Sequence, residues 1–158
     1  MSVLKAVIVQ CGNEEYAISV DSIVSIERLE QVNPIPHLPD FMLGLMKIRG
    51  ELVPILDFEQ ILYNQSARNN PDARIVVVQT KALFVGLLVI DAKEILDIPE
   101  STLTTSGLMA YSRTAYFTAV ANLEDRIITI VDAEVLSQTL AGMDEISDYV
   151  ASQLAEEV

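Results

Sequence analysis

The sequence predicts an all-β fold with a minor helical part. Runs of apolar and β-branched residues, many alternating with polar ones, cover most of the chain, and turn residues separate them. Segments with helical spacing are few and short. Short strands with few helices are typical of barrels and sandwiches. We expect strands at Val3–Cys11, Glu14–Val20, Ile23–Leu29, Met42–Ile48, Glu51–Asp57, Arg74–Thr80, Phe84–Val89, Lys93–Ile98, Ala115–Leu123 and Arg126–Val131.

Tight turns are predicted at both ends of the chain. Gly12-Asn13 lies between the first two runs and Glu124-Asp125 between the last two, as in β-hairpins. In the middle, two apolar runs meet at Arg49-Gly50, where glycine allows a positive φ. Pro54 cannot donate to a strand ladder, so it should lie on an edge or beside a bulge. Arg49, a cation between two hydrophobic runs, is either paired in the core or held for a partner.

Helices are expected at Phe58–Tyr63, Ala133–Leu140 and Asp144–Leu154. The first two follow a faint repeat, in which an apolar strand ends in Asp57 or Asp132 and each Asp is placed to cap a helix. A third Asp-containing copy at residue 91 fits a strand better, because Pro99 follows its apolar residues. Loops are expected at 33–39, 64–71 and 101–112.

Composition limits the classes of function. With 158 residues and 51% hydrophobic residues, the chain can form one compact unit or two very small ones sharing a core. The net charge is −13, and no Lys or Arg follows Arg126, which disfavours nucleic acid and anionic membranes as partners. No apolar run has the roughly 18–20 residues of a membrane span, and no signal peptide is evident, so we expect a cytoplasmic protein. The single cysteine fits a reducing compartment.

Catalytic chemistry finds little support. His37 lies in a proline-rich loop and Cys11 ends an apolar strand, so we expect a surface histidine and a small buried hydrophobe, with no metal site and no cofactor. Asp57 and Asp132 could form an acid–base pair, but helix capping explains both positions. We therefore expect no enzymatic activity.

Four stretches in order resemble the CheW-type adaptor family of bacterial chemotaxis. The family core reads roughly G-x-x-N-L-R-G-x-x-x-P-V-x-D-L, and residues 44–58 follow this pattern. Residues 16–27 resemble the opening segment, residues 85–98 the V-G-x-x-V segment, and residues 126–132 the closing strand. The resemblance covers nearly the whole chain.

The resemblance implies a single domain over residues 1–158, made of two SH3-like five-stranded antiparallel β-barrels that share a hydrophobic interface. It implies a short helix after the middle strands, a changeover between the barrels near 64–73, and an acidic C-terminal helix or tail at 142–158. It implies a non-enzymatic adaptor that binds the regulatory domain of the histidine kinase CheA and the cytoplasmic tip of chemoreceptors. Such an adaptor is recruited to membrane receptor arrays through its partners, and ring assembly with the kinase stays open.

This chain departs from the family pattern at three places. Lys47 replaces the usual Asn before the Arg, and Ser25 replaces a frequent carboxylate. Ile90 stands where the family has Asp, with Asp91 displaced by one residue, which moves it to the opposite strand face. These departures bear on receptor specificity more than on the fold.

Site residues are predicted from the strand and turn patterns together with the resemblance. We expect Glu27 to pair with Arg49, at about 3–5 kcal/mol if the pair is buried and about 0–1 kcal/mol if it is exposed. Structural roles are expected for Gly44, Gly50, Pro54, Asp57 and Asp132. The expected receptor-binding groove consists of Ile23, Val24, Ser25, Ile26, Glu27, Ile48 and Arg49, of which the apolar members could equally be ordinary core. The expected kinase-binding set consists of Gly86, Leu87, Val89 and Ile95.

Two other functions stay open from the sequence. One is the same type of adaptor in another two-component pathway, such as surface motility or pilus control. The other is a carboxylate-dependent hydrolase, which predicts a raised pKa for Asp57 or Asp132 in an open cleft.

Overall fold

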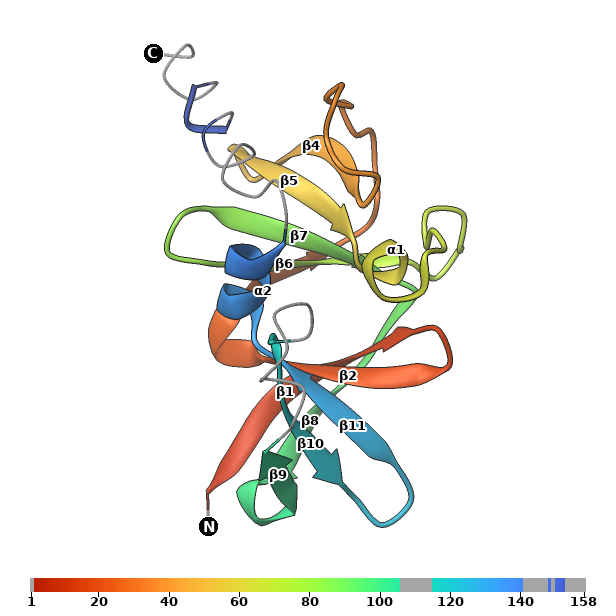
Figure 1. Ribbon diagram of the computed structural model, residues 1–158, viewed down its shortest axis with the longest axis vertical. Helices are drawn as coiled ribbons and strands as arrows, with labels where there is room; N and C mark the ends of the chain where they lie inside the picture. Colours follow the sequence, from red (N-terminus) through yellow and green to blue (C-terminus); the bar gives the residue numbers. More distant parts are fainter. Residues whose placement is uncertain (1, 106–114, 141–147, 149, 153–158) are drawn as a thin grey trace.

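A computed structural model describes residues 2–105, 115–140, 148 and 150–152 of the chain. These residues form two β-sheets, stacked along the long axis, with short helices beside them (Figure 1). None of the described helices is long and apolar enough to cross a membrane. The strands are β1 (Val3–Cys11), β2 (Glu14–Ser19), β3 (Ile23–Glu27), β4 (Met42–Ile48), β5 (Glu51–Asp57), β6 (Arg74–Gln79), β7 (Phe84–Val89), β8 (Asp91–Pro99), β9 (Leu103–Thr105), β10 (Phe117–Asn122) and β11 (Ile127–Val131). The helices are α1 (Phe58–Tyr63), α2 (Ala133–Thr139) and the 3-10 turns η1 (Val20–Ser22) and η2 (Glu100–Thr102).

The two sheets share one plan. One sheet has the order β8-β1-β2-β11-β10-β9 and the other the order β3-β6-β7-β5-β4. In each, a hairpin pairs in parallel with the strand of a second hairpin, β2 with β11 and β7 with β5. The expected pair of small β units is confirmed, but each unit contains one parallel pairing, so neither is wholly antiparallel. The first also has a sixth strand.

The chain crosses between the sheets at two places. It passes from β2 to β3 and returns from β7 to β8, so the N-terminal hairpin completes the sheet formed by β8 to β11. The expected changeover near 64–73 is therefore corrected, since this segment joins α1 to β6 within one sheet. Its polar composition indicates an exposed connection, but composition does not say which sheet the next strand joins.

The predicted helix caps are confirmed. The Oδ1 atom of Asp57 accepts a hydrogen bond from the Gln60 N–H at 3.1 Å, and Asp132 Oδ1 accepts one from Val135 N–H at 3.1 Å. Each Asp follows a parallel-paired strand, so the sequence repeat marks the same place in both units. The copy containing Asp91 begins strand β8, as expected.

One hydrophobic core joins the two units. It combines apolar side chains of β1 and β2 with those of β5, β6 and β7, and each sheet has a smaller core of its own. Aromatic rings lie where the units meet. Tyr16 of β2 contacts Phe58 of α1 edge-on with centroids 5.9 Å apart, and stacks on Phe117 of β10 at 5.8 Å. The expected shared interface is confirmed.

The β4–β5 hairpin has a two-residue turn. Ile48 pairs with Glu51, and both Arg49 (φ 53°) and Gly50 (φ 84°) have positive φ, as the type I′ turn requires. Glycine adopts this backbone freely, whereas a left-handed arginine costs on the order of 1–2 kcal/mol. Arg49 is therefore held in a conformation that its own backbone does not favour.

Gly44 lies at a close approach of two backbones. A β bulge in β4 separates Met42 from Gly44, whose φ is 140°. A Cβ atom at this position would lie 2.2 Å from the Asn33 carbonyl oxygen. At Gly50 a Cβ would meet nothing within 4 Å, so the two glycines are required for different reasons.

Pro54 lies inside a sheet, not on its edge, because β5 pairs with both β4 and β7. Its partner Leu45 exchanges its N–H and C=O bonds with Asn33, so the Leu45–Pro54 pair needs no hydrogen bond. On the other side, pairing with β7 begins at Ile55. The sheet therefore needs no hydrogen bond from the backbone nitrogen of Pro54, and the proline costs it none.

Strand β9 was not predicted. It lies within the expected loop 101–112 and pairs with β10 through Thr105 and Ala119. Threonine and serine suggested a loop, yet β-branched threonine suits a strand when a neighbouring edge is available. Residues 101–102 of that loop belong to η2, and residues 106–112 lie outside the described residues, as does most of the expected helix Asp144–Leu154 and acidic tail 142–158. Asp148 and residues 150–152 are helical, and Val150 is buried.

An ion-pair cluster ties the two ends of the chain together. Arg126, just before β11, donates to both carboxylate oxygens of Glu15 on β2, at 2.9 and 2.7 Å. Lys93 of β8 donates to the same carboxylate at 3.1 Å. Burial alone would raise the pKa of Glu15, but the hydrogen bonds and charges of these two cations outweigh it, so the pKa lies below its ordinary value.

Replacing Glu15 by Gln should destabilise the protein by roughly 1–2 kcal/mol at pH 7, because Arg126 and Lys93 lose a shared partner. Since the folded pKa is lowered, this stabilisation is present above the ordinary glutamate pKa of about 4.3 and is lost as pH falls through the folded value. Melting temperatures of both proteins between pH 7 and pH 3 test this. Glu14→Gln, at the exposed neighbouring residue, is the control and should have little effect. If the difference in melting temperature between Glu15→Gln and the parent stayed constant with pH, the lowered pKa of Glu15 would be contradicted.

Alanine substitutions at the two glycines should differ clearly. Gly44→Ala should lose on the order of 3 kcal/mol or more, because its Cβ collides with backbone. Gly50→Ala should lose about 1 kcal/mol, the cost of a left-handed alanine in open space. Urea unfolding measures both, and equal losses would show that the contact with Asn33 is unimportant.

Candidate interaction surface

Strand β3 presents two exposed apolar side chains. It is an edge strand, and its pairing with β6 shifts register between Ile23 and Ser25, so Val24 is an extra bulged residue. Val24 and Ile26 are 41% and 43% exposed, and they are the only two of the five exposed large apolar residues of the described chain that lie in one strand two positions apart. The Ser25 hydroxyl between them is buried and has no hydrogen-bond partner among the described residues. Edges of this kind are available to another polypeptide.

The predicted partner of Arg49 is confirmed. Arg49 Nε lies 3.7 Å from Glu27 Oε2, with side chains 70% and 29% exposed. The distance is too long for a hydrogen bond, and the exposure puts the pair at about 0–1 kcal/mol. Of the two predicted alternatives, a buried and an exposed ion pair, the exposed one is confirmed. Most of the Arg49 side chain stays open to solvent.

The other expected groove residues divide by burial. Ile48 is buried in the core of its own unit, and Ile23 is partly buried against the shared core. These two therefore act as packing residues beneath the surface. What remains exposed at β3 is the apolar pair of Val24 and Ile26, and the next residue along the strand, Glu27, forms the ion pair with Arg49.

The expected kinase-binding set does not form a surface. Gly86, Leu87 and Val89 are buried in β7, which lies between β6 and β5. A Cβ at Gly86 would lie 2.7 Å from side-chain atoms of both Ile55 and Ile75, so this glycine serves packing. The sequence identified the strand correctly, but it did not show that strands on both sides and a core on each face would cover it.

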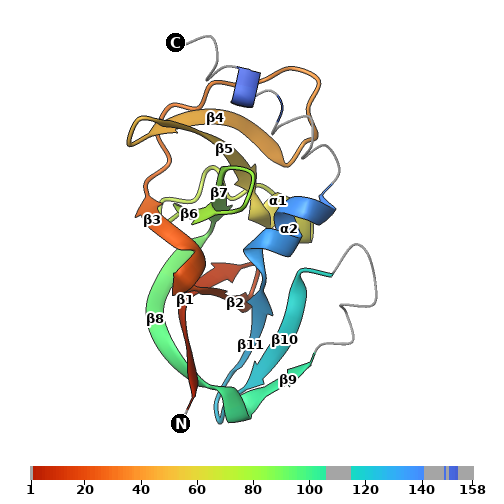
Figure 2. The ribbon, with the colours of Figure 1, turned by 90° about the vertical axis from the view of Figure 1, so that its left-hand side faces the viewer.

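Ile95 is the exception, since it is 65% exposed on β8. Figure 2 shows β3 and β8 along the same side of the molecule, with α1 and α2 on the opposite side. Strand β8, which carries Ile95, therefore lies on the same side of the molecule as strand β3, which carries Val24 and Ile26.

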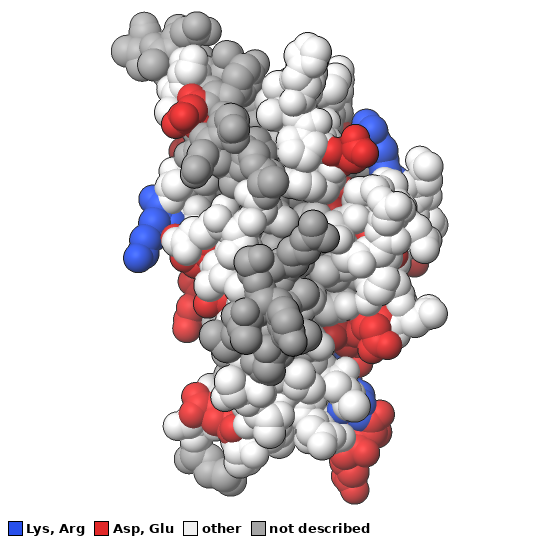
Figure 3. Space-filling view, viewed as in Figure 1, with Lys and Arg blue, Asp and Glu red and all other residues white. Residues whose placement is uncertain are grey.

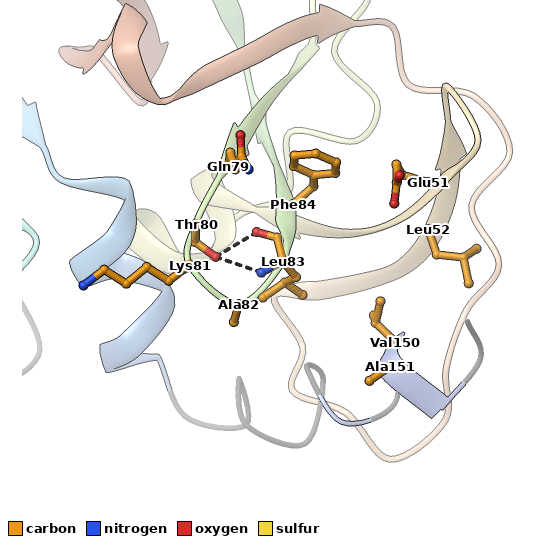
Figure 4. Close-up of a pocket in the computed structure, with 10 residues that line it drawn as sticks. All are labelled: Glu51, Leu52, Gln79, Thr80, Lys81, Ala82, Leu83, Phe84, Val150 and Ala151. Atoms are coloured by element: carbon orange, nitrogen blue, oxygen red, sulfur yellow. Dashed lines mark hydrogen bonds between the residues drawn. The ribbon is translucent and has the colours of Figure 1, made fainter. Parts of the chain in front are cut away.

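Of three hollows in the described part of the chain, two lie away from β3 and one lies at its end. One, of about 260 Å³, lies at the β6–β7 turn, where Val150 faces Leu83 and Leu52 (Figure 4). Thr80 Oγ1 shapes this turn by donating to the Leu83 carbonyl and accepting from its N–H. A second, of about 440 Å³, lies between α1 and α2 beside Phe41 and Tyr116. The third lies at the end of β3 and carries arginine side chains that the sequence did not single out.

The residues considered for catalysis are structural. Asp57 is 1% exposed, and besides capping α1 it accepts hydrogen bonds from Ser66 Oγ and Ala67 N–H. Asp132 caps a helix of the other unit, so the two do not share an open cleft. Burial raises the pKa of the Cys11 thiol strongly, which keeps it protonated and unreactive. His37 is exposed, and among the described residues there is no cluster of three or more metal-ligating side chains.

Two small β units on a common core, with an exposed apolar strand edge, form a docking module. Comparison with known proteins is consistent with this: the model of the CheW-like domain matches residues 5–141, and the chain belongs to this family of chemotaxis scaffold proteins.

Individual relatives match over most of their length. The chemotaxis protein CheW of Klebsiella aerogenes is 28% identical over 139 residues, covering 86% of this chain and 84% of that protein. CheW of Rhizobium meliloti is 27% identical over 124 residues, covering 78% and 80%. The crystal structure of the scaffolding protein TtCheW from Thermoanaerobacter tengcongensis superposes with a TM-score of 0.75 at 22% identity, covering 86% and 88%, and so shares the fold.

A double-mutant cycle on the surface pair should give a coupling free energy below about 1 kcal/mol, since the pair is long and exposed. The variants are Glu27→Arg, Arg49→Glu and the double exchange, compared by urea unfolding. The double exchange should recover what the single reversals lose. Additive losses would show that the two side chains do not interact.

Proposed function

We propose that this chain is a non-enzymatic adaptor that couples chemoreceptors to the histidine kinase CheA. Family membership supports a scaffold role, and the exposed apolar edge of β3 is the observation that favours a polypeptide partner. The adaptor would work in the cytoplasm and reach receptor arrays through its partners.

The receptor tip is proposed to dock on Val24 and Ile26, next to the Glu27–Arg49 pair. Covering two half-exposed aliphatic side chains is favourable at about 25 cal/mol per Å² of apolar surface. The ion pair at the rim would set orientation more than affinity.

The backbone of Arg49 supports a functional role for its side chain. Glycine would fit φ 53° without strain, yet arginine occupies the position and points a mostly open guanidinium at the surface. Backbone strain of this kind gathers at sites that serve binding.

The kinase contact is proposed to include Ile95, the exposed member of the set expected from the sequence.

Titrating the full chain separately with the kinase regulatory domain and with a receptor-tip fragment tests the adaptor role. Two saturable sites that can be filled together support coupling. Binding of only one partner, or mutually exclusive binding, would overturn it. A pull-down that recovers a kinase of a different two-component pathway would redirect the proposal to surface motility or pilus control.

Replacing Ile26 by Ser should weaken binding of the receptor-tip fragment roughly tenfold, because an apolar anchor of about 1–2 kcal/mol is removed. Thermal stability should change little, since the side chain is already half exposed. Ile127→Ser is the matched control, because Ile127 is 60% exposed at the start of β11. If the control weakens binding equally, the β3 surface is not the docking site.

A further inference from the structure

Three arginines converge on one hollow at the end of β3. Arg28 follows this strand, Arg68 belongs to the connection between α1 and β6, at the right of Figure 1, and Arg74 is the first residue of β6. The hollow has a volume of about 280 Å³. Its lining consists of Arg28, Leu29, Arg68, Asn70, Pro71, Ala73 and Arg74.

These cations stand apart from the others of the chain. The structure describes nine of the ten Lys and Arg residues, all but Arg113. Four of the nine form ion pairs within the described chain, namely Lys5, Arg49, Lys93 and Arg126. Arg28, Arg68 and Arg74 do not, although acidic residues outnumber basic ones by 23 to 10. Three of the five cations without such a partner therefore share one hollow.

The loop that carries Arg68 and leads into Arg74 is held by a buried carboxylate. Asp57 accepts hydrogen bonds from Ser66 Oγ at 2.6 Å and from Ala67 N–H at 3.2 Å, directly before Arg68. Asn70 Oδ1 then accepts from Asp72 N–H at 2.9 Å. The same Asp that caps α1 thus fixes the backbone of the loop, so the hollow exists before any ligand arrives.

The side chain of Arg74 is oriented by the two loop residues that precede it. Its Nη1 donates to the carbonyls of Ala73 at 2.8 Å and Asp72 at 3.2 Å. The fork of the guanidinium has further donors, which these two bonds leave for a ligand. Arginine presents such donors in a geometry that matches a carboxylate or phosphate.

We propose that this arginine pocket binds the carboxylates of an acidic segment of a partner protein. Three like charges in one hollow repel one another, and an anion placed among them removes the repulsion. Leu29, Pro71 and Ala73 add apolar surface, which suits the aliphatic stem of a glutamate. An extended polyanion fits less well, because the protein carries a net charge of −13 and the Lys and Arg side chains on the face shown in Figure 3 are few and lie apart from one another.

The test uses three probes: a short acetylated, amidated peptide of Glu and Leu residues, the same peptide with Gln for Glu, and inorganic phosphate. The acidic peptide should bind saturably to the full chain by calorimetry, with affinity falling as salt rises from about 20 to 300 mM. The Gln peptide should not bind. Phosphate binding as tight as that of the peptide would overturn the proposal in favour of a simple oxyanion site.

The variants Arg28→Gln and Arg68→Gln should each weaken peptide binding roughly tenfold, because each removes charge-assisted hydrogen bonds. Their melting temperatures should stay level or rise, since both side chains are exposed and repulsion is relieved. Lys81→Gln, at the exposed β6–β7 turn, removes the same charge elsewhere and should bind as the parent does. If Lys81→Gln lost as much peptide affinity, the binding would depend on the net charge of the protein and not on this pocket, and the proposed site would be overturned. Receptor and kinase binding need not change, so this result and that of the adaptor test are separable.

Discussion

The structure depends on apolar packing between its two sheets. Each unit is small, and a sheet of five or six short strands cannot bury enough apolar surface by itself to offset the entropy of ordering its chain. The rings of Tyr16, Phe58 and Phe117 and the aliphatic residues of β1, β5 and β6 supply the missing burial by packing across the units. The packing of this core fixes the positions of the strands that carry the exposed surface of β3 and the arginine pocket.

Local patterns were enough to predict most elements. Strands β1, β4, β5 and β7 and helix α1 have the predicted bounds, because period-two runs end at turn residues and Asp57 caps the helix. Strand β9 was missed because its three residues form a strand only beside β10. The parallel pairings were missed for a similar reason, since the pairing of distant strands is decided by the whole fold and leaves no local pattern.

The sites were harder to predict than the elements. The pairing of Glu27 with Arg49 could be inferred, because strand alternation and a conspicuous turn arginine are local features. The burial of Leu87 and Val89 could not, since an apolar strand reads the same whether its outer face is covered or open. The arginine pocket was missed because Arg28 and Arg74 are far apart in sequence. The available signal was two arginines within seven residues of an acidic chain, Arg68 in a short polar connection and Arg74 at the start of the next strand.

The crossing of the chain between sheets has a consequence for how the molecule is made. Strands β3 to β7 are contiguous, so this unit can assemble while later residues are still being translated. The hairpin of β1 and β2 is synthesised before β3 to β7, yet its neighbours β8 and β11 are synthesised only after them. During that interval two strand edges lack their native partners and are open to the wrong ones. The β1–β2 hairpin therefore precedes the β3–β7 unit in synthesis but is completed after it, so the yield of native protein depends on how long the unpaired hairpin avoids wrong partners.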